Sequence, residues 1–363
     1  MDIPLHLGLV GPLPPPYGGM ANQTQQLAEL LRGEGLNVSL VQTNAPYHPQ
    51  WVSGLPFIRA LFRLIPFLYA LWQLAGRSDV IHLMANSGWS WHLFAAPAIW
   101  IAKFHKVPIV VNYHGGKADT FLAKSARSIR FSMRQTSALI VPSDFLKAVF
   151  ARYSISASIV PNIIDAARFN KSAPHRAIRR HMLVSRNLEP IYDNETAIRA
   201  FSIVHRSYPD ATLTIAGSGP LAKSLALLAE NLGIAGAVMF AGRLDRDAMA
   251  QAYRAADIAI NPSLVDNMPI SVLEALASGV PVVSTNVGGI PFVVKDEQTA
   301  LLVPPKSPDA MAKAILRLMD DAALSDRLLD NGLMEVQKFT WQQVWPILSK
   351  VYGKARHLTC LPA

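Results

Sequence analysis

The chain has 363 residues, of which 51% are hydrophobic and 16% are charged. This length suits two domains, and the composition supports large buried cores and excludes an intrinsically disordered chain. Because Cys360 is the only cysteine, no disulfide can form within the chain, and the ten histidines show no spacing typical of a metal site. The apolar N-terminus lacks a basic leader region, so we expect a buried first strand and a cytoplasmic protein.

The net charge of +9 is concentrated in the first half of the chain. Residues 1–165 contain 13 Lys and Arg against 7 Asp and Glu, whereas residues 166–363 contain 21 against 18. A basic surface of this kind binds nucleic acid, an anionic membrane or a phosphorylated substrate. No nucleic-acid-binding motif accompanies the charge, so it favours a membrane or phosphate partner.

Strand-like and helix-like segments alternate along nearly the whole chain, which predicts parallel sheets with helices on both faces. The segment 160–180 is polar and basic with two prolines, and we interpret it as a linker between domains at 1–165 and 178–337. The predicted strands are Leu5–Val10, Val38–Gln42, Val80–Leu83, Ile109–Asn112, Leu139–Val141 and Ser158–Val160 in the first domain, and His181–Ser185, Thr212–Ala216, Val238–Ala241, Ile258–Asn261, Val280–Ser284 and Leu301–Val303 in the second.

Three short motifs follow predicted strands. Gly18-Gly19 follows the first strand and precedes a predicted helix, where glycine permits close backbone approach to a ligand and the helix N-terminus favours anions. His114 and Arg186 stand where strands end, at the edge of an open α/β sheet that binds ligands. A guanidinium is a charged fork that suits phosphate oxygens. Taken alone, each motif is also compatible with a structural turn or an exposed strand end.

The segment 261–289 carries the most information. Asp266 lies eight residues before Glu274, which belongs to an apolar helical run, and Gly288-Gly289 predicts a tight turn. Two acids at this spacing can both bind hydroxyl groups of a ligand; the alternative is that Asp266 caps a helix and Glu274 is a solvated helix residue. The backbone amides at the start of the helix favour phosphate oxygens.

This segment, together with Arg186 and the glycine pair, resembles the retaining glycosyltransferases of GT-B fold that are grouped as family 4 (group 1). The resemblance implies an α/β protein with two Rossmann-like domains facing across a central cleft, the first binding the acceptor and the second the nucleotide sugar. It also implies a last helix, 340–356, that packs back on the first domain. The implied reaction moves a sugar from a nucleoside diphosphate sugar to an acceptor hydroxyl with retention, without cofactor or metal, in cell-surface glycan or glycolipid biosynthesis.

The resemblance also implies roles for individual residues, with two departures from the family pattern. Asp266 stands where the family usually has Glu, and the expected phosphate-binding lysine falls on Ile191 or Tyr192. The missing lysine leaves an inactive glycosyltransferase-like partner subunit open as an alternative, and a sugar-nucleotide epimerase is a weaker one. The implied catalytic residues are His114, Arg186 and Asp266, and the implied donor-binding residues are Gly18, Gly19, Arg243, Leu244, Met268, Ile270, Ser271 and Glu274.

One further feature needs no family. Residues 35–78 contain no acid but several aromatic residues, and the apolar run Leu55–Gly76 carries arginines and Pro66, which favour an interfacial helix over a membrane span. We therefore expect a glycan or lipid-linked acceptor and a peripheral position at the inner face of an anionic membrane. The alternative is a buried helix beside a solvated basic face. The predicted basic surface comprises Arg59, Arg63, Lys124, Arg127, Arg130 and Arg134, and the aromatic residues are Trp51, Phe57, Phe62, Phe67 and Trp72.

Overall fold

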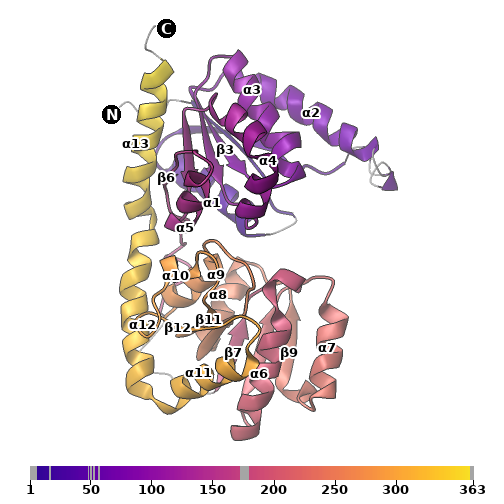
Figure 1. Cartoon of the computed structure of the whole chain (residues 1–363), viewed down its shortest axis with the longest axis vertical. Helices are drawn as coiled ribbons and strands as arrows, with labels where there is room; N and C mark the ends of the chain where they lie inside the picture. Colours follow the sequence, from indigo (N-terminus) through magenta and orange to yellow (C-terminus); the bar gives the residue numbers. More distant parts are fainter. Residues whose placement is uncertain are drawn as a thin grey trace. The chain divides into compact units, whose positions relative to one another are not determined.

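The computed structural model describes residues 6–15, 18–47, 49, 51, 54–55, 58–171 and 180–359. The chain forms two compact units, the first made of Met1–Ile163 with Trp341–Ala363 and the second of Ile164–Thr340 (Figure 1). Some residues named above lie outside the described ranges, namely Leu5, Phe57, Cys360 and residues 172–179 of the predicted linker.

The first unit contains a six-stranded parallel sheet in the order β2-β1-β3-β4-β5-β6. Its central strands are apolar on both sides because helices cover both faces: α2, α3, α4 and α5 pack on one face, and α1 and α13 on the other. The elements are β1 (His6–Gly11), α1 (Gly19–Gly33), β2 (Asn37–Gln42), α2 (Ile58–Ala75), β3 (Val80–Ala85), η2 (Trp91–Ala95), α3 (Ala96–Phe104), β4 (Ile109–Tyr113), α4 (Ala118–Met133), β5 (Ala138–Val141), α5 (Asp144–Ala151), β6 (Ser158–Ile159) and α13 (Trp341–Thr359).

The C-terminal helix α13 is part of the core of the first unit. Val344, Leu348 and Tyr352 are buried in one apolar cluster with residues of β1, β3 and β4. The Tyr352 hydroxyl lies 2.7 Å from Nδ1 of His82, which is fully buried on β3. The first turn of α13 is also anchored, since Nε1 of Trp341 donates a hydrogen bond to Glu34 at 2.8 Å.

The second unit contains another six-stranded parallel sheet, in the order β12-β11-β10-β7-β8-β9. Helices α6, α7, α11 and α12 pack on one face, and α8, α9 and α10 on the other. The elements are β7 (His181–Val184), η3 (Pro190–Tyr192), α6 (Asn194–Ser207), β8 (Thr212–Ala216), α7 (Ala222–Asn231), η4 (Ala235–Ala237), β9 (Val238–Gly242), α8 (Arg246–Ala255), β10 (Ile258–Asn261), α9 (Ile270–Ala277), β11 (Val282–Thr285), α10 (Ile290–Val293), β12 (Leu301–Val303), α11 (Pro308–Asp320), α12 (Ala322–Val336) and η5 (Gln337–Phe339).

Every predicted strand is present, with small changes at the ends. The largest changes are of two residues: β3 ends at Ala85 instead of Leu83, and β11 begins at Val282 instead of the predicted Val280. Pro281 has no amide hydrogen to donate, and only its carbonyl joins the sheet, accepting from the amide of Ala259 at 2.9 Å. Among the residues that the structure describes, no helix is both long enough and apolar enough to cross a membrane.

Candidate functional site

Arg186 follows β7 at the carboxyl edge of the second sheet, and three side chains fix its guanidinium. Nε donates a hydrogen bond to Asn261 Oδ1 at 2.8 Å, and Nη2 forms an ion pair with Asp266 in which the two side chains are only 11% and 14% exposed. The ring of Tyr192 lies below the guanidinium, with its centroid 5.1 Å from Cζ. Among the described residues none accepts a hydrogen bond from Nη1, so both N–H groups of this nitrogen can donate to an anion.

Arg186 and Asp266, which the sequence placed 80 residues apart, therefore form one unit. Burial raises the pKa of the Asp266 carboxyl, while the charge of Arg186 and the amide of Asn267, which donates to it at 3.0 Å, work in the opposite direction. Because the carboxylate offsets the guanidinium charge, the pair carries little net charge. It offers a ligand oriented N–H donors on one edge of the guanidinium.

The glycine pair after β11 fixes the loop that carries Asp266. The amide of Gly289 donates to the carbonyl of Asp266 at 2.9 Å, and Gly288 adopts a left-handed φ of +55°. A Cβ atom would lie 2.2 Å from the carbonyl oxygen of Asp266 at Gly288 and 1.8 Å from that of Asn267 at Gly289. Only glycine fits at these two positions, so the turn determines where the Asp266 loop runs.

Glu274 lies on α9, and its side chain is half-buried beside Tyr253. Burial raises the pKa of Glu274 to about 7, although the charges of Arg246 and Arg186 and the Tyr253 hydroxyl oppose the increase. Tyr253 is itself fully buried, and its hydroxyl donates to the carbonyl of Ser271 at 2.9 Å. Near neutral pH this carboxyl is close to its titration point, so it can both accept and donate hydrogen bonds.

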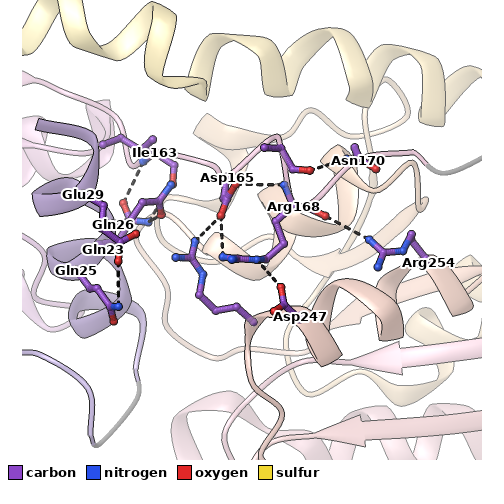
Figure 2. A network of polar contacts seen from close by, with 12 residues as sticks. Gln23, Gln25, Gln26, Glu29, Ile163, Asp165, Arg168, Asn170, Asp247 and Arg254 are labelled. Atoms are coloured by element: carbon purple, nitrogen blue, oxygen red, sulfur yellow. Dashed lines mark hydrogen bonds and ion pairs between the residues drawn. The ribbon is translucent and has the colours of Figure 1, made fainter. Parts of the chain in front are cut away.

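Ion pairs around Asp165 hold Arg246, whose charge acts on the carboxyl of Glu274. Figure 2 shows the part of this network at Asp165, Arg168 and Asp247. Oδ2 of Asp165 accepts hydrogen bonds from Arg168 Nη1 at 2.9 Å and from Arg246 Nη2 at 3.0 Å. Arg168 also donates through Nε to Asp247 at 2.7 Å, as Figure 2 shows, which ties the first turn of α8 to the segment after Ile164.

The start of α9 carries the predicted donor-loop amides. Pro269 is the N-cap residue, and its carbonyl accepts a hydrogen bond from the amide of Val272 at 3.1 Å. No side chain among the described residues caps the helix, so the amides of Ile270 and Ser271 are left for another acceptor. Oγ of Ser271 is buried and makes no hydrogen bond within the described part of the chain, whereas Met268 is 5% exposed and Ile270 half-buried.

Arg243 and Leu244 follow the edge strand β9, two strands from Arg186. Arg243 is exposed, and Leu244 packs against the apolar cluster that includes α8 and α9. The structure thus brings Arg186, Asp266, Glu274 and the start of α9 together and leaves Arg243 farther along the same sheet edge.

In the first unit, His114 directly follows β4 and its amide donates to the carbonyl of Ala85 at 3.0 Å. Burial lowers the pKa of His114 to about 4, so the imidazole is neutral at pH 7 and acts through hydrogen bonds, not charge. Gly115 is required by packing, since a Cβ atom there would lie 2.5 Å from the Tyr113 hydroxyl, which contacts Ser87 Oγ at 2.6 Å.

Gly18 and Gly19 differ from the other glycines named here. Gly18 is the N-cap residue of α1 with extended backbone, φ −170°, and Gly19 is the first residue of the helix. A Cβ atom at either position would meet no described atom within 4 Å. Neither backbone strain nor packing requires glycine at this helix start, so a role of the pair in ligand binding stays a prediction.

Exposed apolar side chains gather on α2, α3 and α4 of the first unit. The ring centroids of Trp72 and Phe104 lie 5.0 Å apart, and those of Trp100 and Phe131 5.2 Å apart, so the rings connect the three helices. Phe67, by contrast, points into the core. We call the following residues the aromatic surface: Leu61, Phe62, Ile65, Tyr69, Trp72, Trp100, Phe104 and Phe131.

The predicted basic residues of this unit fall into two groups. Arg63 donates to the carbonyl of Ala45 at 3.1 Å and lies over the ring of Tyr47, and Arg130 donates to the carbonyl of Tyr153 at 2.8 Å. Both therefore support local structure. The exposed group is Arg59, Lys124, Arg127 and Arg134.

Asn261, Arg246, Tyr253 and Tyr192 also line this site, and the sequence analysis assigned no role to them. Asn261 ends β10 at the same sheet edge as Arg186, and this strand-end position is the feature of the sequence that could have indicated its place in the site. The contacts of the other three depend on partners distant in sequence.

Comparison with known proteins covers nearly the whole chain. A family model described as glycosyl transferases group 1 matches residues 167–333, and one described as glycosyltransferase family 4 matches residues 17–168. A glycogen synthase of Mycobacterium tuberculosis is 29% identical over 294 residues, covering 77% of this chain and 70% of the relative. A GDP-mannose-dependent alpha-(1-6)-phosphatidylinositol monomannoside mannosyltransferase of the same species is 28% identical over 283 residues, covering 71% and 73%.

Solved structures confirm the predicted fold. Sucrose-phosphate synthase from Thermosynechococcus elongatus superposes with a TM-score of 0.78 at 21% identity, covering 98% of this chain and 99% of that one. Anabaena HepE, solved in complex with UDP, gives a TM-score of 0.72 at 17% identity, covering 98% and 100%. The two parallel sheets with flanking helices are therefore those of the GT-B fold.

Proposed function

Because the chain belongs to the group 1 glycosyltransferases, we propose that it is a retaining hexosyltransferase using a nucleoside diphosphate sugar. The observation that carries this proposal is the cluster at the edge of the second sheet. There Arg186, held by Asn261 and Asp266, lies beside Glu274 and the uncapped start of α9. A directed N–H edge and free helix amides suit a diphosphate, and a carboxyl nearby suits ribose hydroxyls.

In the proposed reaction the bond between the anomeric carbon and the diphosphate oxygen breaks, and the acceptor oxygen bonds to the same face of that carbon. The acceptor hydroxyl proton passes to an oxygen of the departing diphosphate, so no protein nucleophile is needed. Arg186 Nη1 and the α9 amides stabilise the charge that develops on the diphosphate. Asp266 orients the sugar through hydrogen bonds, and His114 of the first unit, which is neutral at pH 7, acts through hydrogen bonds as well. The proposed reaction uses no metal or other cofactor.

The assignment of the two units follows from the same proposal. The second unit binds most of the donor and the first unit binds the acceptor, while Gly18 and Gly19 remain proposed donor-binding residues and His114 a proposed catalytic residue of the first unit. Arg243 and Leu244 contact the nucleotide base.

Release of nucleoside diphosphate from a panel of UDP- and GDP-sugars, with and without candidate acceptors, tests the activity. Acceptor-dependent release with the donor's anomeric configuration kept in the product, read by NMR, is the expected result. No release from any donor indicates an inactive partner subunit, and sugar interconversion without transfer indicates an epimerase. Inversion at the anomeric carbon would overturn the retaining mechanism alone.

The aromatic surface supports a second part of the proposal, a peripheral position at the inner face of an anionic membrane with a lipid-linked or glycan acceptor. Eight large apolar side chains are exposed on α2, α3 and α4, beside the exposed bases Arg59, Lys124, Arg127 and Arg134. Each basic residue near an anionic surface contributes about 1 kcal/mol to binding. A relative named above acts on a phosphatidylinositol monomannoside, which is a lipid.

Flotation with phosphatidylserine-containing vesicles tests this part. We expect binding that weakens with salt and is lost when the four exposed bases become Glu. The matched control converts four exposed bases of the second unit, Arg206, Lys223, Lys313 and Arg327, to Glu and should still float. Equal loss in both variants, or no flotation of the unchanged protein at low salt, contradicts a specific membrane surface.

A further inference from the structure

Tyr192 stands at one of the two positions where the family resemblance places a phosphate-binding lysine, and its ring contacts Arg186 instead. Tyr192 ends the short 3₁₀ turn η3, and its ring centroid lies 5.1 Å from Cζ of Arg186. This distance is within the range of about 6 Å at which a guanidinium is attracted to an aromatic face.

The backbone around Tyr192 holds the ring in place. The carbonyl of Ile191 accepts a hydrogen bond from the amide of Leu264 at 2.8 Å, which ties η3 to the loop leading to Asp266. The amide of Tyr192 donates to Glu189 at 3.0 Å, and the next residue, Asp193, has a left-handed φ of +43° from which α6 begins. The ring is therefore fixed to the same loop as the carboxylate that binds Arg186.

We infer that Tyr192 is a positioning residue for Arg186, an inference that rests on the proposed diphosphate site. Asn261 accepts from Nε and Asp266 accepts from Nη2, while the ring of Tyr192 contacts the face of the guanidinium. These contacts hold the guanidinium in one orientation, so that Nη1 points toward the proposed ligand. A lysine would add a further cation beside Arg186, whereas the tyrosine orients the guanidinium of Arg186. The Tyr192 hydroxyl is neutral at pH 7, as is ordinary for tyrosine, and burial raises its pKa further.

Substitutions that keep or remove the ring test the inference. Tyr192→Phe and Tyr192→Trp should leave kcat/KM for the donor within about twofold, whereas Tyr192→Leu should lower it about three- to thirtyfold. Tyr208→Leu is the matched control, because the Tyr208 ring lies 4.6 Å from Cζ of Arg180 in the same unit. This control should leave kcat/KM unchanged. Should Tyr192→Leu fail to fold by its melting curve, Tyr192→Met takes its place.

A double-mutant cycle with Arg186→Ala separates positioning from simple packing. Binding of UDP and GDP is measured by calorimetry in the four proteins. If Tyr192 acts through Arg186, Tyr192→Leu weakens binding in the unchanged background and has no further effect once Arg186 is removed.

Several results would overturn the inference. These are an equal loss in both backgrounds, a loss in Tyr192→Phe as large as in Tyr192→Leu, or no loss in Tyr192→Leu. A protein that binds nucleotide with the expected cycle but transfers no sugar would contradict the proposed function and leave the role of Tyr192 standing. Failure of the unchanged protein to bind either nucleotide would overturn both.

Discussion

Glu274→Gln should make the protein more stable at pH 8 and less able to bind its nucleotide. Burial raises the pKa of Glu274 from 4.5 to about 7. Between these two values the folded protein keeps the carboxyl protonated while the unfolded chain ionises it. The free energy of unfolding therefore falls as pH rises through this window and stays lower above it. Glutamine does not ionise, so it does not lose stability in this way, and its amide can still form a hydrogen bond with the Tyr253 hydroxyl.

A pKa displacement of this size lowers the free energy of unfolding at pH 8 by at most about 3 kcal/mol, and Glu274→Gln should recover this amount. For a unit of this length that is a gain in Tm of about 6–12 °C. The gain should shrink as pH falls to 5, while the affinity for UDP or GDP should fall about ten- to hundredfold through loss of charged hydrogen bonds to ribose. Calorimetric melting at pH 5, 6, 7 and 8 measures the first effect, and titration calorimetry the second.

Glu297→Gln is the control, because the pKa of Glu297 is displaced in the opposite direction from that of Glu274. A hydrogen bond from Arg317 lowers the pKa of Glu297, so this variant should show no gain in Tm at pH 8. A Tm difference for Glu274→Gln that is the same at pH 5 and pH 8, or a variant less stable than the unchanged protein at pH 8, would refute the reasoning.

Three further predictions test the site. Arg186→Lys keeps the charge but cannot satisfy Asn261, Asp266 and a phosphate at once, so kcat should fall at least about a hundredfold with little change in Tm; near-normal turnover would point to another cation. Gly289→Ala should cost about 3 kcal/mol or more, because its Cβ atom meets the carbonyl of Asn267, whereas Gly19→Ala should keep its stability and lose turnover; equal melting of the two variants would contradict the packing argument. Activity should persist in excess chelator, and loss that a divalent ion restores would show that a metal takes part.

The strands and most of their ends follow from the sequence because each strand is a short apolar run bounded by turn residues, whereas the order of the strands in each sheet comes from the structure alone. The contact partners of individual side chains, in contrast, cannot be predicted from such patterns. Arg63 and Arg127 look alike in a basic stretch, yet only the fold reveals that Arg63 binds the carbonyl of Ala45 while Arg127 is exposed. The same holds for the two glycine pairs. Gly288-Gly289 is required by neighbouring carbonyl oxygens, and Gly18-Gly19 borders open space.

The candidate site was predictable in outline and not in its contacts. The positions of Arg186, Asp266 and Glu274 at a sheet edge follow from strand ends and helical spacing. The ion pair between Arg186 and Asp266 depends on a loop whose course is set by Gly289, which lies 23 residues after Asp266 in the chain. The sequence indicated nothing about Tyr192 except that a lysine was expected near this position. Its contact with Arg186 could not be predicted, because Asn261 and Asp266, which hold Arg186, lie far away in the sequence.

The place of α13 in the first unit has a consequence for how the protein is made. Residues 164–340 are synthesised as one continuous stretch and can complete the second unit as they emerge. The first unit is begun earlier but finished later, since the sheet face with Leu7, Leu9 and Val110 has no cover from α13 until Val344 and Leu348 have been added. Until Tyr352 arrives, His82 has no hydroxyl partner for Nδ1. A chain that ends near residue 340 would therefore have a complete second unit and, in the first unit, an uncovered and aggregation-prone sheet face.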